Sequence, residues 1–220
     1  MQATVSTSIP VRTRSRAFER LAGVCGIVTG ISSLLYAVFF LLVKGALHDL
    51  LPPLLLATGG LLATTVIVAL YQRVRAADET FAFWAVALGI LGQMGAAIHG
   101  VYGLFGVLHP SATAVTLATT ANQLDPAGFL AFGAVGVSVF VMAWLILRGS
   151  ALSPRLGYLG LLLGILLVAL FLGALIVNDN SSLFILVPGG LASLLATPAW
   201  NIWLGAVYLS DGAAAPRQTP

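Results

Sequence analysis

Six segments of the chain are long and apolar enough to cross a lipid bilayer, and this feature constrains the fold most. They are residues 21–43, 52–71, 81–108, 126–147, 156–177 and 183–209. About 20 apolar residues in a helix span a hydrocarbon core of roughly 30 Å. None of the six segments contains Asp, Glu, Lys or Arg. The sequence therefore predicts an all-α, polytopic membrane protein, a bundle of six transmembrane helices with short loops.

The composition excludes the other fold classes. Hydrophobic residues make up 59% of the 220 residues and charged residues 8%. So few charges could not keep a soluble fold with this much apolar surface in water, and a disordered chain needs far more charge. Strands of a membrane β-barrel alternate apolar and polar residues over about 10 positions. The run from Leu159 to Leu167 does not alternate, and in lipid it satisfies its backbone only as a helix.

The basic residues predict how the bundle is oriented. Nine of the 10 lie on one side of the six-span topology, and only Lys44 lies on the other; the nine are Arg12, Arg14, Arg16, Arg20, Arg73, Arg75, Arg148, Arg155 and Arg217. Positive residues favour the cytoplasmic side. We therefore expect a cytoplasmic segment 1–20, a membrane domain 21–209 and a cytoplasmic tail 210–220, in a bacterial inner membrane. The basic residues flank apolar spans, so the partner is the lipid bilayer and not nucleic acid.

Glycine spacing predicts how the helices pack. In lipid, helices associate through close contacts at small residues. Gly26 and Gly30 form one G-x-x-x-G pair, Gly160 and Gly164 form another, and span 81–108 carries a glycine stripe. We expect these pairs to lie inside the bundle and not at a dimer face. Pro188 should distort the last span, as should Pro198. Aromatic residues near the span ends suit an interfacial belt; they are Trp84, Trp144, Trp200, Trp203 and Tyr208.

No catalytic motif is present in the sequence. It has no G-x-S-x-G, H-E-x-x-H or P-loop pattern, and its one cysteine, Cys25, cannot form a C-x-x-C pair. The spans also lack the buried carboxylate that ion-coupled pumps usually use. The sequence therefore favours a protein that is not an enzyme.

Four polar side chains inside the spans are candidate ligand-binding groups: His99, Gln93, Tyr102 and Asn201. His99 is the only histidine within a span, with Gly95 and Gly103 four residues to either side. One interpretation is an axial ligand to haem or a chlorophyll-type pigment. The other is a neutral histidine hydrogen-bonded to a neighbouring helix. Gln93 lies about 120° from His99 around the helix, so these two do not share one face.

A second polar group is expected at the external ends of the spans. Its members are His48, Asp49, His109, Asp125 and Asp179. They come from separate loops without ligand-like spacing, so no metal site is assigned. Asp125 also fits a helix cap followed by Pro126 in the first turn. The longer loop, residues 111–124, is predicted to be either an external helix or re-entrant segment, or a disordered loop.

Three stretches resemble a group of bacterial six-span membrane proteins known only as a domain of unknown function. These stretches are residues 20–23, 154–160 and 198–205. The resemblance implies a fold and no activity. The leading hypothesis is an accessory or structural membrane subunit, or a module that binds a small hydrophobic ligand. The alternatives are a small transporter or channel lined by His99, Gln93 and Asn201, and a haem- or pigment-binding subunit that uses His99.

Overall fold

The computed structural model describes residues 15–109, 125–177 and 182–213. Within these residues, six helical spans are long and apolar enough to cross a membrane, and no strand occurs. The predicted all-α six-span bundle is therefore confirmed, and the protein is an integral membrane protein. The loop 111–124, Asp179, and the terminal segments 1–14 and 214–220 lie outside the described residues.

The first three spans are single helices. They are α1 (Arg16–Leu42), α2 (Ala46–Val74) and α3 (Glu79–Leu108). Side chains cap two of them: Ser15 Oγ accepts a hydrogen bond from the Phe18 amide, and the Asp78 carboxylate accepts one from the Phe81 amide. α2 begins six residues before the predicted start at Pro52, after Gly45 at φ 86°. α1 and α3 thus begin before their apolar segments because polar side chains cap their starts, whereas α2 begins after Gly45 without a side-chain cap.

The fourth and sixth spans are interrupted. The fourth consists of a short 3₁₀ turn η1 (Pro126–Gly128), a π-helical segment η2 (Phe129–Ala134) and α5 (Val135–Arg148). The fifth is one helix, α6 (Pro154–Val177). The sixth consists of α7 (Leu183–Leu191), a second π-helical segment η3 (Ala192–Ala196) and α8 (Thr197–Ala213). The predicted distortion of the last span therefore lies between its two prolines.

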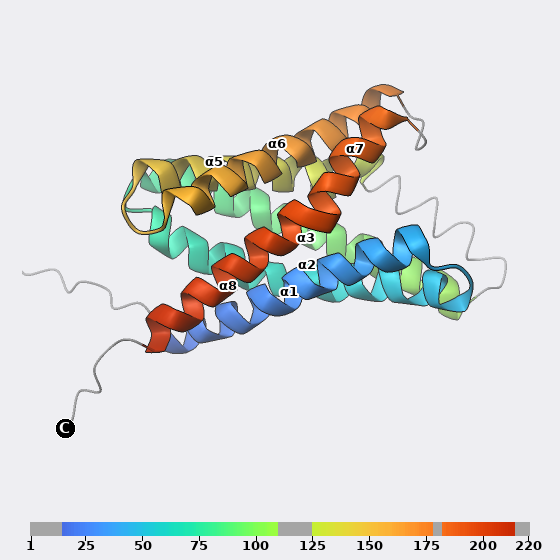
Figure 1. Cartoon of the computed structure of the whole chain (residues 1–220), viewed down its shortest axis with the longest axis horizontal. Coiled ribbons are helices and arrows are strands. Elements are labelled where there is room, and N and C mark those ends of the chain that lie inside the picture. The colour runs from blue at the N-terminus through green and yellow to red at the C-terminus, as the bar shows by residue number, and fades with distance from the viewer. Residues whose placement is uncertain (1–14, 110–124, 178–181, 214–220) are drawn as a thin grey trace, which may run out of the picture.

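The last span closes the bundle by crossing it diagonally (Figure 1). From α1 to α6 each helix packs against the next, with α5 following α3. α7 then lies against α6, whereas α8 lies against α1 at the other end of the bundle. This crossing brings the final helix into contact with both the first and the fifth span.

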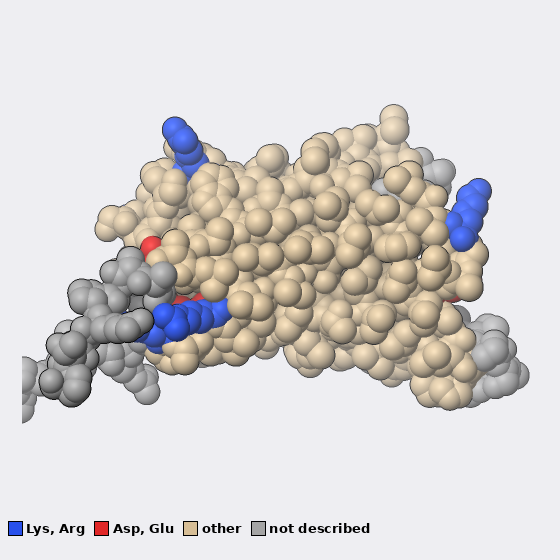
Figure 2. Space-filling model, turned by 60° about the horizontal axis from the view of Figure 1, so that its bottom comes forward, with Lys and Arg blue, Asp and Glu red and all other residues tan. Residues whose placement is uncertain are grey.

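The outer surface is apolar. Leu42, Ile176 and Phe184 are 76%, 77% and 74% exposed. In Figure 2 the visible Lys and Arg side chains lie toward the ends of the molecule, and the surface between them carries no charge. Such a surface is unfavourable in water and suits a hydrocarbon environment.

Glycines make the close helix contacts that the sequence predicts. A Cβ on Gly26 would lie 2.9 Å from the Asn201 carbonyl oxygen, and a Cβ on Gly205 would lie 2.6 Å from that of Gly23. On the other side of the bundle, a Cβ on Gly164 would lie 2.8 Å from the Gly136 oxygen. The G-x-x-x-G pairs therefore face helices of this chain. The glycines of the α3 stripe face different surroundings. Gly92 and Gly95 face η2, whereas a Cβ on Gly106 would meet no atom of the described residues within 4 Å.

Two aromatic residues expected in the interfacial belt belong to the core. Trp200 is 4% exposed and Tyr208 is fully buried. The belt prediction is wrong for these two because the diagonal crossing turns their face of α8 inward. Trp84, by contrast, is 48% exposed and Trp203 is 37% exposed.

Candidate functional site

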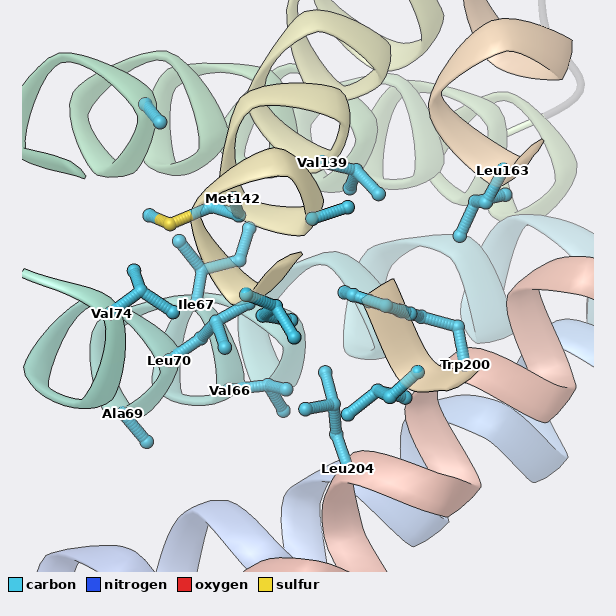
Figure 3. Packing of buried hydrophobic residues seen from close by; sticks show 14 of the residues in the cluster. Val66, Ile67, Ala69, Leu70, Val74, Val139, Met142, Leu163, Trp200 and Leu204 are labelled. Atoms are coloured by element: carbon cyan, nitrogen blue, oxygen red, sulfur yellow. The ribbon is translucent and has the colours of Figure 1, made fainter. Parts of the chain in front are cut away.

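The centre of the bundle contains a chamber of about 40 Å³. Five spans contribute to its wall, through α2, α3, α5, α6 and α8. Most of the wall is apolar; Figure 3 shows Val66, Met142, Leu163 and Trp200 around this part of the core. The chamber lies where the diagonal span passes the middle of the bundle, so it exists only in the assembled fold.

Four polar side chains line this chamber: Gln93, Ser138, Thr197 and Asn201. Ser138 is fully buried and its Oγ donates to the Ala85 carbonyl oxygen at 2.6 Å. Asn201 Nδ2 donates to the Thr197 carbonyl oxygen at 3.0 Å. Within the described part of the chain, the Gln93 amide has no hydrogen-bond partner. The chamber therefore combines apolar walls with neutral hydrogen-bonding groups.

The interrupted spans position these groups. Val135 and Thr197, the first residues after η2 and η3, both line the chamber. Pro198 cannot donate a backbone hydrogen bond, and the wider π turn before it accommodates the missing donor. Asn201 follows one turn later. The Asn201 side chain thus donates beside the break, but to the Thr197 carbonyl oxygen and not to that of Leu194, which Pro198 leaves without its regular donor.

The start of the fourth span differs from the regular helix that the sequence predicts. Ala127 and Gly128 have φ values of 54° and 72°, and this turn brings the Asp125 carboxylate back over the span. Its Oδ1 accepts from the Leu130 amide at 2.6 Å, and its Oδ2 accepts from the Ala131 amide at 3.2 Å. Asp125 is therefore a cap, as predicted, but it caps η2 and not a first α-helical turn.

His99 does not line the chamber. It is exposed on the outer surface of α3, and Tyr102 on the next turn is half-buried. Gln93 and His99 therefore lie on different faces of α3, as predicted. A haem or pigment at His99 stays a prediction, and its macrocycle would have to bind on the outer surface of the bundle. Of the proposed transport lining, the structure brings Gln93 and Asn201 together without His99.

The external polar group is dispersed. His48 Nδ1 lies 3.1 Å from the Phe39 carbonyl oxygen, and His109 Nδ1 lies 3.3 Å from the Phe105 oxygen. Asp49 is exposed, and Asp125 is occupied by its capping role. Among the described residues, no three His, Cys, Asp or Glu side chains are grouped to hold a metal ion. These residues are explained by local helix-end contacts.

A buried ion cluster at the opposite end was missed by the sequence analysis. The Arg73 side chain is 2% exposed and contacts Glu19 at 3.2 Å and Asp211 at 2.5 Å. Its guanidinium also lies 4.9 Å from the centre of the Tyr208 ring. The cluster joins α1, α2 and α8. The signal in the sequence was that Glu19 and Asp211 are acidic residues placed among arginines on the same side.

Searches against protein-family models, curated proteins and solved structures find no match to this chain. The resemblance to a six-span group of unknown function stays a prediction.

Proposed function

We propose that this protein is an accessory subunit of a membrane complex that docks onto another membrane protein through the outer surface of α3. The observation that supports this role is the exposed His99 within a membrane-spanning helix. Histidines at membrane depth almost always face a bundle interior or a polar cavity, because hydrocarbon cannot satisfy their ring nitrogens. His99 has no hydrogen-bond partner within the described part of the chain. A helix of another subunit that offers a polar group would remove this cost.

The surface around His99 suits helix docking. Tyr102, Gly103 and Gly106 follow His99 by three, four and seven residues, so they lie on the same side of α3. Tyr102 is half-buried, Gly103 is exposed, and a Cβ on Gly106 would meet no described atom within 4 Å. Small residues next to a hydrogen-bonding side chain allow a second helix to approach closely in lipid. We call His99, Tyr102, Gly103 and Gly106 the α3 docking surface.

Site-specific photocrosslinking in the native membrane tests this role. A photoreactive residue at Tyr102, one turn after His99, should crosslink to one other membrane protein at fixed stoichiometry. A photoreactive residue at Leu162, an exposed position on α6, is the control and should crosslink to lipid only. His99→Leu should abolish the protein crosslink, whereas Met94→Leu, on another side of the same helix, should retain it. His99→Asn should retain part of it, because an amide still forms hydrogen bonds.

Three results would contradict the proposal. Crosslinks from Tyr102 to lipid alone would show an uncovered surface. Crosslinks confined to this chain would show that the chain covers its own surface. Crosslinks to a second copy would make the surface a self-association face and not an accessory contact.

The second candidate is a small transporter or channel, favoured by the convergence of Gln93 and Asn201 on one chamber. Transport sites in membrane bundles often lie near the midplane between interrupted helices, and both interrupted spans contribute residues to the wall of this chamber. The test is the flux of small neutral solutes into liposomes that contain the purified protein. Gln93→Leu should reduce the flux, and a flux no greater than that of empty liposomes would exclude this candidate.

The chamber does not support the hydrophobic-ligand module. Sites for drug-sized ligands measure about 300–1,000 Å³, whereas this chamber measures about 40 Å³. A hydrophobic ligand would therefore have to bind on the outer surface of the bundle, for example on the α3 docking surface, in competition with lipid.

A further inference from the structure

The polar groups of the central chamber have more hydrogen-bonding capacity than the protein uses. Gln93 carries two N–H donors and a carbonyl acceptor, and none is used within the described part of the chain. Asn201 uses one of its two donors, toward Thr197. Ser138 uses its single donor, toward Ala85, and its oxygen can still accept. Gln93 is half-buried, and Ser138 and Asn201 are buried; polar groups that are shielded from bulk solvent nearly always have partners, because an unpaired one is costly.

We propose that the central chamber is a binding site for ordered water, held by Gln93, Ser138, Thr197 and Asn201. One water molecule needs about 10–15 Å³ measured in the same way, so a chamber of about 40 Å³ has room for two or three. Cavities that stay dry are lined by apolar side chains alone, whereas water enters cavities that offer two or more polar partners. This chamber offers four such side chains.

The chamber selects for neutral molecules. Among residues 15–109, 125–177 and 182–213, no Asp, Glu, Lys, Arg or His side chain lines it, so an ion there would lose its hydration without gaining a counter-charge. Water is neutral and needs no counter-charge. It can donate to the Gln93 and Asn201 carbonyl oxygens and accept from the Gln93 amide group, so its hydrogen bonds are replaced. His99 faces away from the chamber, so hydration does not depend on the docking role proposed above.

Radiolytic hydroxyl-radical labelling with mass spectrometry tests the proposal, because radicals made from bound water oxidise buried side chains beside it. Met142 is fully buried and Trp200 is 4% exposed, and both line the chamber. Cys25 is also 4% exposed and does not line it, so its thiol is a reactive, buried internal control. In the detergent-purified full chain, we expect Met142 and Trp200 to be oxidised at least several-fold faster than Cys25.

Two matched variants distinguish oxidation by radicals from bound water from oxidation by radicals that diffuse in from outside. Gln93→Leu removes one polar wall of the chamber and should slow oxidation of Met142 and Trp200 several-fold. Gln72→Leu is the same substitution on α2, at a position that does not line the chamber, and should leave their oxidation unchanged. A wild-type protein in which Met142 and Trp200 are protected as well as Cys25 would overturn the proposal. Equal oxidation in the wild type and Gln93→Leu would also overturn it.

Thermal stability supplies an independent readout. In a dry chamber the Gln93 amide would be unsatisfied, so Gln93→Leu would raise the melting temperature. In a hydrated chamber the amide is satisfied through water, so Gln93→Leu should leave the melting temperature unchanged or lower it. A clear rise would therefore contradict hydration.

Discussion

The guanidinium of Arg73 is the buried charge that joins three helices at the arginine-rich end. The other described arginines are exposed or half-buried, whereas the Arg73 side chain is 2% exposed and has two carboxylate partners. One of these partners, Glu19, is itself only 9% exposed, whereas Asp211 is 55% exposed. The same ion cluster therefore contains one contact shielded from solvent and one open to it. Their contributions to stability should differ accordingly.

Replacing Arg73 should destabilise the bundle far more than replacing Asp211. Arg73→Met leaves the Glu19 carboxylate buried without its partner, which should cost about 3–5 kcal/mol of unfolding free energy. Asp211→Asn removes a solvent-exposed charge and should cost less than about 1 kcal/mol. Reversible unfolding in mixed detergent micelles measures both, and Arg75→Met serves as a control. Equal losses for Arg73→Met and Asp211→Asn would show that burial does not set the strength of this cluster.

At the scale of elements, two kinds of contact stabilise the bundle. One is the close approach of helices at glycines, and the other is the cap that Asp125 forms on η2. α1 and α8 approach each other at Gly23, Gly26 and Gly205, where a Cβ would meet backbone atoms. Backbone atoms cannot move aside as the end of a flexible side chain can. The spacing of these contacts therefore determines how closely the diagonal span lies on α1.

Gly205→Ala should weaken the contact between α1 and α8. The new methyl group would lie 2.6 Å from the Gly23 carbonyl oxygen, and overpacking of this kind costs about 1–3 kcal/mol. Gly190→Ala is the matched control, because a Cβ there meets none of the described atoms within 4 Å and alanine favours the helix by about 0.5–1 kcal/mol. Unfolding free energies should fall for the first variant and stay level or rise for the second. A tolerated Gly205→Ala would contradict the close packing.

Asp125 should protect the start of η2 from local opening. Asp125→Ala removes the acceptor of the Leu130 and Ala131 amides, which should cost about 0.5–2 kcal/mol. Hydrogen exchange at these two amides should accelerate, while exchange in α6 should stay unchanged. Asp125→Asn keeps one acceptor oxygen and should show an intermediate effect. Unchanged exchange at Leu130 in the alanine variant would rule out the cap.

At the scale of the whole molecule, features that depend on local sequence were predictable. Features that depend on the diagonal crossing of the last span over the bundle were not. The six spans and the G-x-x-x-G contacts depend on local composition and spacing, so the sequence predicted both. The burial of Trp200 and the pairing of Arg73 with Asp211 both require α8 to cross the bundle. No local pattern specifies that crossing, so the sequence placed Trp200 in the interfacial belt and gave no pairing for Arg73. Gln93 and Asn201 were grouped in the transporter alternative, but with His99, which the structure places outside the chamber.

The outward orientation of the His99 side chain was only partly predictable from the sequence. Its separation from Gln93 followed from helix geometry, but which of the two faces inward depended on the neighbours of α3. Gly60 and Gly100 bring α2 against one side of α3, and Gly92 brings η2 against another. These contacts leave the His99 side exposed. The α3 docking surface therefore follows from glycine packing as much as from His99 itself.

Cysteine accessibility in sealed membrane vesicles tests most directly that lipid surrounds this chain and that it crosses six times. In a Cys25→Ala background, single cysteines replace Ala76, Ser150 and Lys44, which lie in the connections α2–α3, α5–α6 and α1–α2. A membrane-impermeant thiol reagent should label Ala76→Cys and Ser150→Cys from one side and Lys44→Cys only from the other. Labelling of Ala76→Cys and Lys44→Cys from the same side would contradict the six-span account.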